Sequence, residues 1–297
     1  MREIKKNQGN KMISATSCYV VAEIGINHNG DLETAMKLMR EAKACGCDAV
    51  KFQKRTIDLV YTKEELAKLR DSPFGSTNRD LKEGLEFGKS EYQELAELAE
   101  EIEIDWYASP WDQKSIEFLL DYDIPYLKVP SALVTSTEYL QACASSGRPL
   151  LVSTGMCDLK MIKQAVEVIL SAGGEIACLY HCTSTYPSSI DELNLRGIYT
   201  LQEEFSNIPI GYSGHEITPH TTLMAAVMGA RSVERHMTLS RALWGTDQAA
   251  SLEVPAFAKL VRQIRNIELA SGDGQIRFYE SEIPIAEKLR KVDDLFS

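Results

Sequence analysis

The chain of 297 residues lacks the features that mark several large classes of protein. It has no apolar run near the ~20 residues that a membrane-spanning helix needs, and residues 1–11 are polar and mixed in charge, unlike a signal peptide. Its seven cysteines include no CxxC pair, so we expect reduced thiols and a cytoplasmic location. The net charge is −11 and no basic run occurs, so we expect neither a nucleic acid nor a membrane as partner.

What the chain does contain is eight short apolar runs, each ending in a polar residue able to bind a ligand. Amphipathic segments separate them, such as residues 31–46, where Asp31 can cap a helix that ends near Gly46. This alternation predicts an α/β fold, the (β/α)8 or TIM barrel, with an active site at the C-terminal ends of its strands. The runs are Tyr19–Glu23, Ala49–Gln53, Asp105–Ser109, Pro125–Lys128, Pro149–Ser153, Ala177–Ser184, Ile208–Ser213 and Ser232–His236.

We expect one catalytic domain over residues 1–297, with an N-terminal extension at 1–18 and a C-terminal tail at 272–297. The connection after the second run, from Thr56 to Lys89, is longer than one helix requires. It is either a substrate-covering lid, with Asn78 or Arg79 reaching inward, or a solvated excursion. Beyond it, Ser90 and Gln93 match a capping box that would open the next helix.

Two of the five histidines, His215 and His236, fall at the ends of the last two runs. Neighbouring strands lie about 4.8 Å apart, so both imidazoles can reach one metal ion. Two histidines with water and substrate oxygens would form an open Lewis-acid site. The alternative is that each histidine only hydrogen-bonds within a polar barrel end.

Lys51 and Lys128 each follow apolar strand residues, where a lysine must reach water or a bound anion. A phosphate held by these lysines and nearby hydroxyls fits the pattern. A Schiff-base lysine, or a barrel-end salt bridge with Glu23 or Glu234, remains an alternative. The hydroxyl and backbone donors expected nearby belong to Ser131, Ser153, Thr154 and Gly155.

Seven ordered motifs between about Tyr19 and Gly274 resemble the catalytic barrel of the sialic acid (N-acetylneuraminate) synthase family. They are Ala22–Gly30 (AEIGINHNG), Val50–Gln53 (VKFQ), Leu127–Ser131 (LKVPS), Val152–Met156 (VSTGM), His181–Pro187 (HCTSTYP), Gly211–His215 (GYSGH) and Val233–His236 (VERH).

The resemblance implies a transferase that condenses phosphoenolpyruvate with an open-chain hexose or N-acylhexosamine. The acceptor would be similar to N-acetylmannosamine, with or without a 6-phosphate, and the products a sialic-acid-type 2-keto-3-deoxy acid and phosphate, formed by metal-assisted C–O cleavage. His215 and His236 would hold Mn²⁺, with Mg²⁺ or Co²⁺ as alternatives. The positions implied for phosphoenolpyruvate are Lys128, Ser131, Ser153 and Ser213, and those for the sugar are Glu23, Lys51, Gln53, Tyr186 and Asp247.

The sequence departs from the family pattern in three places. Ser184 stands where an asparagine usually contacts phosphoenolpyruvate, and Leu133 where a glutamate often contacts the sugar. Many members continue into an antifreeze-like domain, whereas this sequence stops at Ser297, so we expect a short form with a more open acceptor site. A homo-oligomer is compatible with the resemblance. The alternatives are a Schiff-base barrel aldolase or lyase using Lys128 or Lys51, and a sugar-binding barrel without turnover.

Overall fold

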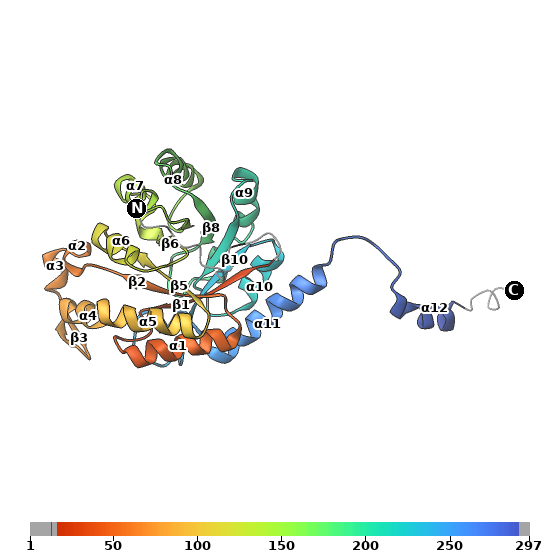
Figure 1. Ribbon diagram of the computed structural model, residues 1–297, viewed down its shortest axis with the longest axis horizontal. Coiled ribbons are helices and arrows are strands. Elements are labelled where there is room, and N and C mark those ends of the chain that lie inside the picture. Colours follow the sequence, from red (N-terminus) through yellow and green to blue (C-terminus); the bar gives the residue numbers. More distant parts are fainter. Residues whose placement is uncertain (1–12, 14–16, 291–297) are drawn as a thin grey trace.

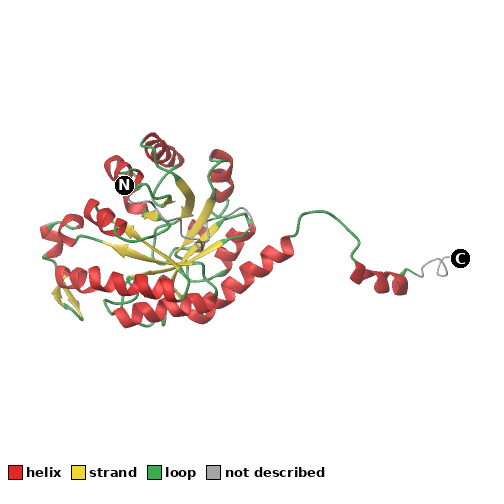
Figure 2. Ribbon diagram, in the orientation of Figure 1, coloured by secondary structure: helices red, strands yellow, loops and turns green. Residues whose placement is uncertain are grey.

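The computed structural model describes residue 13 and residues 17–290, and it forms a barrel of parallel strands wrapped by helices (Figures 1 and 2). The strands are hydrogen-bonded in the order β5-β2-β1-β10-β9-β8-β7-β6, and β5 and β6, at the two ends of this order, lie against each other. The predicted TIM barrel is confirmed, since every predicted run overlaps one barrel strand. The strands are β1 (Tyr19–Gly25), β2 (Ala49–Lys54), β5 (Asp105–Pro110), β6 (Leu127–Val129), β7 (Leu150–Ser153), β8 (Ile176–Cys182), β9 (Ile210–Gly214) and β10 (Ser232–Thr238).

The outer helices begin and end largely at the expected capping residues. Asp31 accepts a hydrogen bond from the Thr34 backbone N–H at 3.1 Å, and Gly46 ends that helix with φ of 86°. The predicted capping box is wrong, because Ser90 lies inside its helix and Glu91 instead accepts from the Gly88 backbone N–H at 3.0 Å. The helices are α1 (Leu32–Cys45), α5 (Lys89–Glu101), α6 (Gln113–Leu120), α7 (Thr137–Ala144), α8 (Leu159–Ser171), α9 (Gly197–Glu204), α10 (His220–Val227) and α11 (Val254–Ser271). Among the described helices, none combines the length and apolar character needed to cross a membrane.

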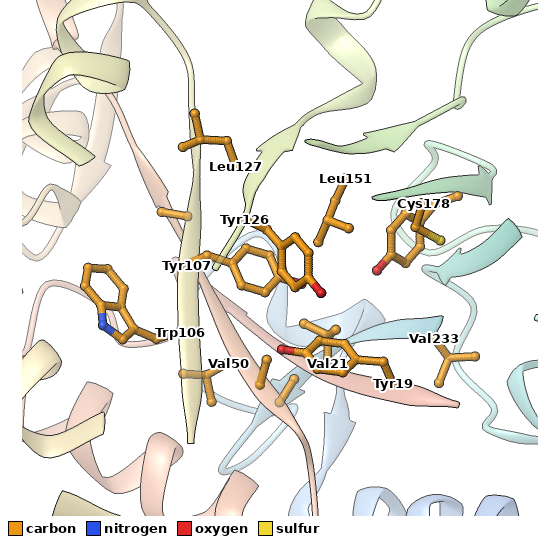
Figure 3. Close-up of a cluster of buried hydrophobic side chains, with 14 of the residues drawn as sticks. Tyr19, Val21, Val50, Trp106, Tyr107, Tyr126, Leu127, Leu151, Cys178 and Val233 are labelled. Carbon is orange, nitrogen blue, oxygen red and sulfur yellow. The ribbon is translucent and has the colours of Figure 1, made fainter. Parts of the chain in front are cut away.

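The interior of the barrel is filled with aromatic and aliphatic side chains (Figure 3). Tyr126 makes edge-to-face contacts with Tyr19 and Tyr107, at ring-centroid distances of 6.0 and 5.9 Å. The hydroxyl of Tyr19 donates to Asp105 at 2.7 Å, so this buried phenol keeps a hydrogen-bond partner. These rings leave a solid floor beneath the C-terminal ends of the strands, where polar side chains begin.

The long second connection has its own secondary structure and lies on one side of the barrel (Figure 1). The ring of Phe74 in its hairpin makes an edge contact with Trp244 at 6.4 Å. The expectation that Arg79 reaches inward is wrong: its guanidinium pairs with Asp58 at 2.6 Å and Glu83 at 2.7 Å on the surface. The elements of this insertion are α2 (Ile57–Val60), α3 (Lys63–Leu66), β3 (Leu69–Ser72), β4 (Gly75–Thr77) and α4 (Asn78–Leu85).

Beyond the barrel, β11 (Leu252–Glu253) pairs with β10, and the chain after α11 runs away from the barrel to α12 (Ile283–Leu289) (Figure 1). The predicted tail thus begins where α11 ends. Most of the predicted N-terminal extension lies outside the described residues.

Candidate active site

A cavity of about 270 Å³ opens at the C-terminal ends of the strands. Its lining contains the predicted site residues except Asp247 and Arg79. Asp247 lies beside it, with its Oδ2 3.9 Å from Nδ1 of His236, while Arg79 points away. The lining residues are Glu23, Lys51, Gln53, Ser109, Trp111, Lys128, Pro130, Ser131, Ala132, Ser153, Met156, Cys182, Ser184, Tyr186, Ser213, His215, Glu234 and His236.

The register of the strands brings the central residues to one level. Glu23 on β1 pairs with His236 on β10 and with Lys51 on β2, and Glu234 pairs with Ser213 on β9. Because side chains alternate faces along a strand, residues two apart share the barrel interior. The predicted parity of these strands is therefore confirmed.

Two lysines and two glutamates form a buried network at the floor of the cavity. Lys51 Nζ lies 2.7 Å from Glu23 and 3.6 Å from Glu234, and Lys128 Nζ lies 3.1 Å from Glu234. Ser213 Oγ donates to Glu234 at 3.1 Å. The salt-bridge alternative for both lysines is thus realised, and both ammonium groups still line the cavity.

Burial shifts the pKa values of this network in different directions. It raises the pKa of Glu23 to about 7, although the Lys51 ammonium opposes the shift. For Glu234, burial is outweighed by Lys128 and Lys51, which hold its pKa well below the usual range. Burial lowers the pKa of Lys128, whereas two carboxylates outweigh burial and raise the pKa of Lys51. Glu23 is therefore the member that can gain or lose a proton near neutral pH.

The two predicted metal ligands lie next to each other in the cavity lining, with ring centroids 5.5 Å apart. Burial lowers the pKa of His236 to about 3, so its imidazole is neutral. His215 directs Nδ1 at the Thr183 carbonyl, 2.8 Å away, which leaves its Nε2 for a ligand. Nδ1 of His236 is buried and has no hydrogen-bond partner among the described residues, as expected of a nitrogen that serves a ligand not yet bound.

His215 and His236 can supply two ligands to a divalent ion, but not a complete set of ligands. No group of three or more His, Cys, Asp or Glu side chains in the described part of the chain has metal-binding geometry. A metal held by His215 and His236 would therefore take its other ligands from water and substrate oxygens.

Hydroxyl and backbone groups surround the Lys128 side of the cavity. A Cβ on Gly155 would lie 2.2 Å from the Ser184 hydroxyl and 2.6 Å from that of Ser131, so only glycine lets these groups converge. Lys128 Nζ lies 3.8 Å from the centroid of the Tyr180 ring, which holds the ammonium against the aromatic floor. One cation and several neutral donors thus face the same space.

Seven lining residues were not among the predicted site residues: Ser109, Trp111, Pro130, Ala132, Met156, Cys182 and Glu234. Ser109, Cys182 and Glu234 lie on predicted strands, so strand parity could have found them. Trp111 follows β5 in a loop and has no sequence signal. Leu133, the departure expected near the sugar, does not line the cavity, whereas its neighbour Ala132 does.

Behind the two histidines lies a fully buried ion pair between Glu216 and Arg235, the residues adjacent to them in the chain. Arg235 Nη1 donates to Glu216 Oε1 at 2.9 Å and to Thr222 Oγ1 at 2.8 Å, and Tyr212 donates to Glu216 at 3.0 Å. The pair ties the end of β10 to the segment after β9. The two histidines are thus joined, through their chain neighbours, by a buried ion pair.

Known proteins resemble this chain over most of its length. The NeuB family profile matches residues 38–276. The N,N'-diacetyllegionaminic acid synthase of Legionella pneumophila is 37% identical over 94% of this chain and 80% of its own, and the human N-acetylneuraminate-9-phosphate synthase is 38% identical over 92% and 77%. Among solved structures, the N-acetylneuraminic acid synthetase of Leptospira borgpetersenii superposes with a TM-score of 0.80 at 29% identity, covering 94% of each chain. The chain thus belongs to the NeuB family and is an enzyme of the sialic acid synthase type.

Proposed function

We propose that this enzyme condenses phosphoenolpyruvate with an open-chain hexose or N-acylhexosamine to give a 2-keto-3-deoxy acid and phosphate. The observation that carries the proposal is one cavity with two poles: buried lysines and hydroxyls on one side, and two histidines free to bind a ligand on the other. A phosphate ester suits the first pole, and an aldehyde oxygen the second.

The lysine pole would bind the phosphate of phosphoenolpyruvate. Lys128 supplies the charge, and Ser131, Ser153, Ser184 and Ser213 supply neutral donors that line the same space. The sugar would lie between the poles, with its hydroxyls near Glu23, Gln53 and Tyr186 and close to Asp247. Holding both reactants in one desolvated cavity removes much of the entropic cost of a two-substrate reaction.

The histidine pole fits a divalent ion, for which we propose Mn²⁺, with Mg²⁺ or Co²⁺ as alternatives. A metal held by His215 and His236 would supply Lewis-acid polarisation of the acceptor's aldehyde oxygen.

The chain's own residues account for the proton movements that the reaction requires. Carbon 3 of phosphoenolpyruvate forms the new bond to the aldehyde carbon, and water then adds to carbon 2. Phosphate leaves with the electrons of the C–O bond and takes the proton of the carbon-2 hydroxyl, whose oxygen becomes the keto oxygen. Glu23 lies in the cavity with its pKa near 7, so it can take the proton that the adding water loses and pass it to the oxygen of the former aldehyde, which becomes a hydroxyl.

The test is phosphate release from phosphoenolpyruvate in the presence of Mn²⁺ and a panel of sugars, namely N-acetylmannosamine, mannose, their 6-phosphates and bacterial diacetamido sugars. Release should need a sugar and stop with EDTA, and a heavy isotope placed in the bridging oxygen of phosphoenolpyruvate should leave in the phosphate. If no sugar supports release, or if EDTA leaves it unchanged, the proposal is wrong.

A separate trapping experiment tests the Schiff-base alternative. This alternative remains open because Lys128 is buried and its pKa is lowered. Borohydride with a carbonyl substrate should fail to trap a covalent adduct. The acceptor end can be examined separately by comparing catalytic efficiencies for N-acetylmannosamine and mannose. A ratio above about a thousandfold, roughly 4 kcal/mol, would show that this enzyme discriminates strongly in favour of the N-acyl group.

A further inference from the structure

Strand β2 carries polar residues toward the mouth of the barrel on one face. Lys51 and Gln53 line the cavity, and Arg55 follows two residues later, just past the end of the strand. Residues two apart share a face and rise about 6–7 Å along the strand, so Arg55 stands above Gln53. Its contacts agree: its Nη2 donates to Gln53, and its guanidinium carbon lies 4.2 Å from the centroid of the Trp111 ring.

Lys51 and Arg55 differ in whether a carboxylate neutralises their positive charge. Lys51 is neutralised by Glu23 and Glu234. Arg55 has no carboxylate within ion-pairing distance in the part of the chain that the structure describes, and its Nε is buried without a hydrogen-bond partner. The protein thus holds an unneutralised guanidinium against two walls of the cavity, in a chain of net charge −11.

The inserted helix α4 adds a second cation at this place. Lys82 is partly buried, and its Nζ lies 5.0 Å from the centroid of the Tyr61 ring. No carboxylate among the described residues forms an ion pair with it. Burial lowers the pKa of Lys82, and the positive charges of Arg55 and Arg70 lower it further, against Asp247 and Glu65.

Lys82 therefore lies within electrostatic reach both of Arg55 and of Asp247, which is beside His236. An anion bound between Arg55 and Lys82 would relieve the repulsion between them and supply the charge partner that neither has as an ion pair among the described residues. Lys128, proposed to bind the phosphate of phosphoenolpyruvate, is on β6, and the two histidines are at the ends of β9 and β10, whereas Arg55 follows β2, so this anion is distinct from that phosphate.

We propose that Arg55 and Lys82 form a second anion subsite that binds a phosphate on the acceptor sugar, at the end remote from its aldehyde. The inference rests on the proposed function. With the aldehyde at the histidine pole and the hydroxyls along Gln53 and Asp247, the far end of an extended sugar points out of the barrel toward Arg55. Two cations match a phosphate dianion better than a neutral hydroxyl.

The test compares N-acetylmannosamine 6-phosphate with N-acetylmannosamine in the wild type, Lys82→Met and Arg55→Met. The wild type should use the phosphorylated sugar with at least about tenfold higher catalytic efficiency, since one charge-assisted contact is worth that much. Either substitution should reduce this ratio by about tenfold or more. The KM for phosphoenolpyruvate should change little.

Arg79→Met is the matched control, because Arg79 is a cation on the same helix whose charge is taken up by Asp58 and Glu83. It should leave the ratio at the wild-type value. A ratio near one in the wild type, an equal effect of Lys82→Met on both sugars, or a loss in Arg79→Met as large as in Lys82→Met would each overturn the subsite.

Direct binding separates this inference from the proposed function. Calorimetry with N-acetylmannosamine 6-phosphate and no phosphoenolpyruvate should give a dissociation constant that rises about tenfold or more in Lys82→Met. If no sugar supports phosphate release, the proposed reaction fails, yet this binding experiment still decides the subsite. If both sugars react equally well and bind equally tightly, only the subsite fails.

Discussion

Replacing Arg235 by methionine should destabilise the barrel and loosen the site at the same time. The substitution removes a fully buried guanidinium that donates to Glu216 at 2.9 Å, to the Thr218 carbonyl at 3.0 Å and to Thr222 at 2.8 Å. Glu216, itself fully buried, would keep only its hydroxyl partners. Breaking a buried pair from one side typically costs about 3–5 kcal/mol, because the remaining charge is left without compensation.

The magnitude can be separated into its parts with a double variant. Arg235→Met combined with Glu216→Gln removes both charges, so it should recover part of the loss relative to Arg235→Met alone. The free energy of unfolding is measured for the wild type, Arg235→Met, Glu216→Gln and the double variant. Urea unfolding is followed by tryptophan fluorescence. A loss below about 1 kcal/mol in Arg235→Met, the range of exposed ion pairs, would refute the view that this pair is buried and coupled.

The second measurement is metal affinity. A variant that is less stable but still folded should bind the metal as the wild type does, unless the two histidines have moved. Glu216 and Arg235 are the chain neighbours of His215 and His236, so losing the pair frees the two histidines to move relative to each other. Calorimetric titration of the folded Arg235→Met protein with Mn²⁺ should therefore show weaker binding than in the wild type. Equal affinity would mean that the histidines are held by other contacts.

Three further variants test the site and the fold. His236→Ala should abolish turnover and weaken Mn²⁺ binding with an unchanged circular dichroism spectrum; unchanged affinity in calorimetry would contradict the metal assignment. Lys128→Met should weaken phosphoenolpyruvate binding by about tenfold or more with little change in metal binding, and a wild-type KM would make Lys128 structural. Burial lowers the pKa of His28 to about 4, so between about pH 6.5 and 4 the unfolded chain binds a proton that the folded one does not. Stability should fall with pH in that window by about 1.4 kcal/mol per unit from this residue, and His28→Gln should reduce the slope; identical slopes in the two proteins would show that the folded His28 takes up its proton normally.

The barrel and the floor of the site could be predicted because both follow from short-range patterns. An apolar run ending in a polar residue defines a strand and its tip, and alternation along the strand then assigns Lys51 and Gln53 to one face. Order along the chain places the tips together once the barrel closes. The same alternation places Glu234 on the inner face of its strand, but the sequence alone does not distinguish a salt-bridge partner from a residue that lines the cavity.

The insertion that would carry part of the second anion subsite could not be predicted in the same way, because it folds by its own pairing. A capping box between Thr77 and Asp80 begins α4, and Leu81 and Leu85 bury one face. Periodicity identifies that buried face of α4. It does not predict which of the remaining side chains of the helix are directed toward the C-terminal end of the barrel. Arg79 and Lys82 lie on α4 within one turn of each other, and only the folded insertion shows that Arg79 pairs with surface carboxylates.

The distribution of charge explains how an acidic protein can serve anionic substrates. At the floor, the positive charges of Lys51 and Lys128 are balanced by Glu23 and Glu234, so the network carries no uncompensated buried charge. While Glu23, whose pKa is near 7, holds the proton of the adding water, that network would be net positive beside the departing phosphate. Protonation of Glu23 and binding of the anion would favour each other at this stage, which requires no excess of basic residues over the chain as a whole.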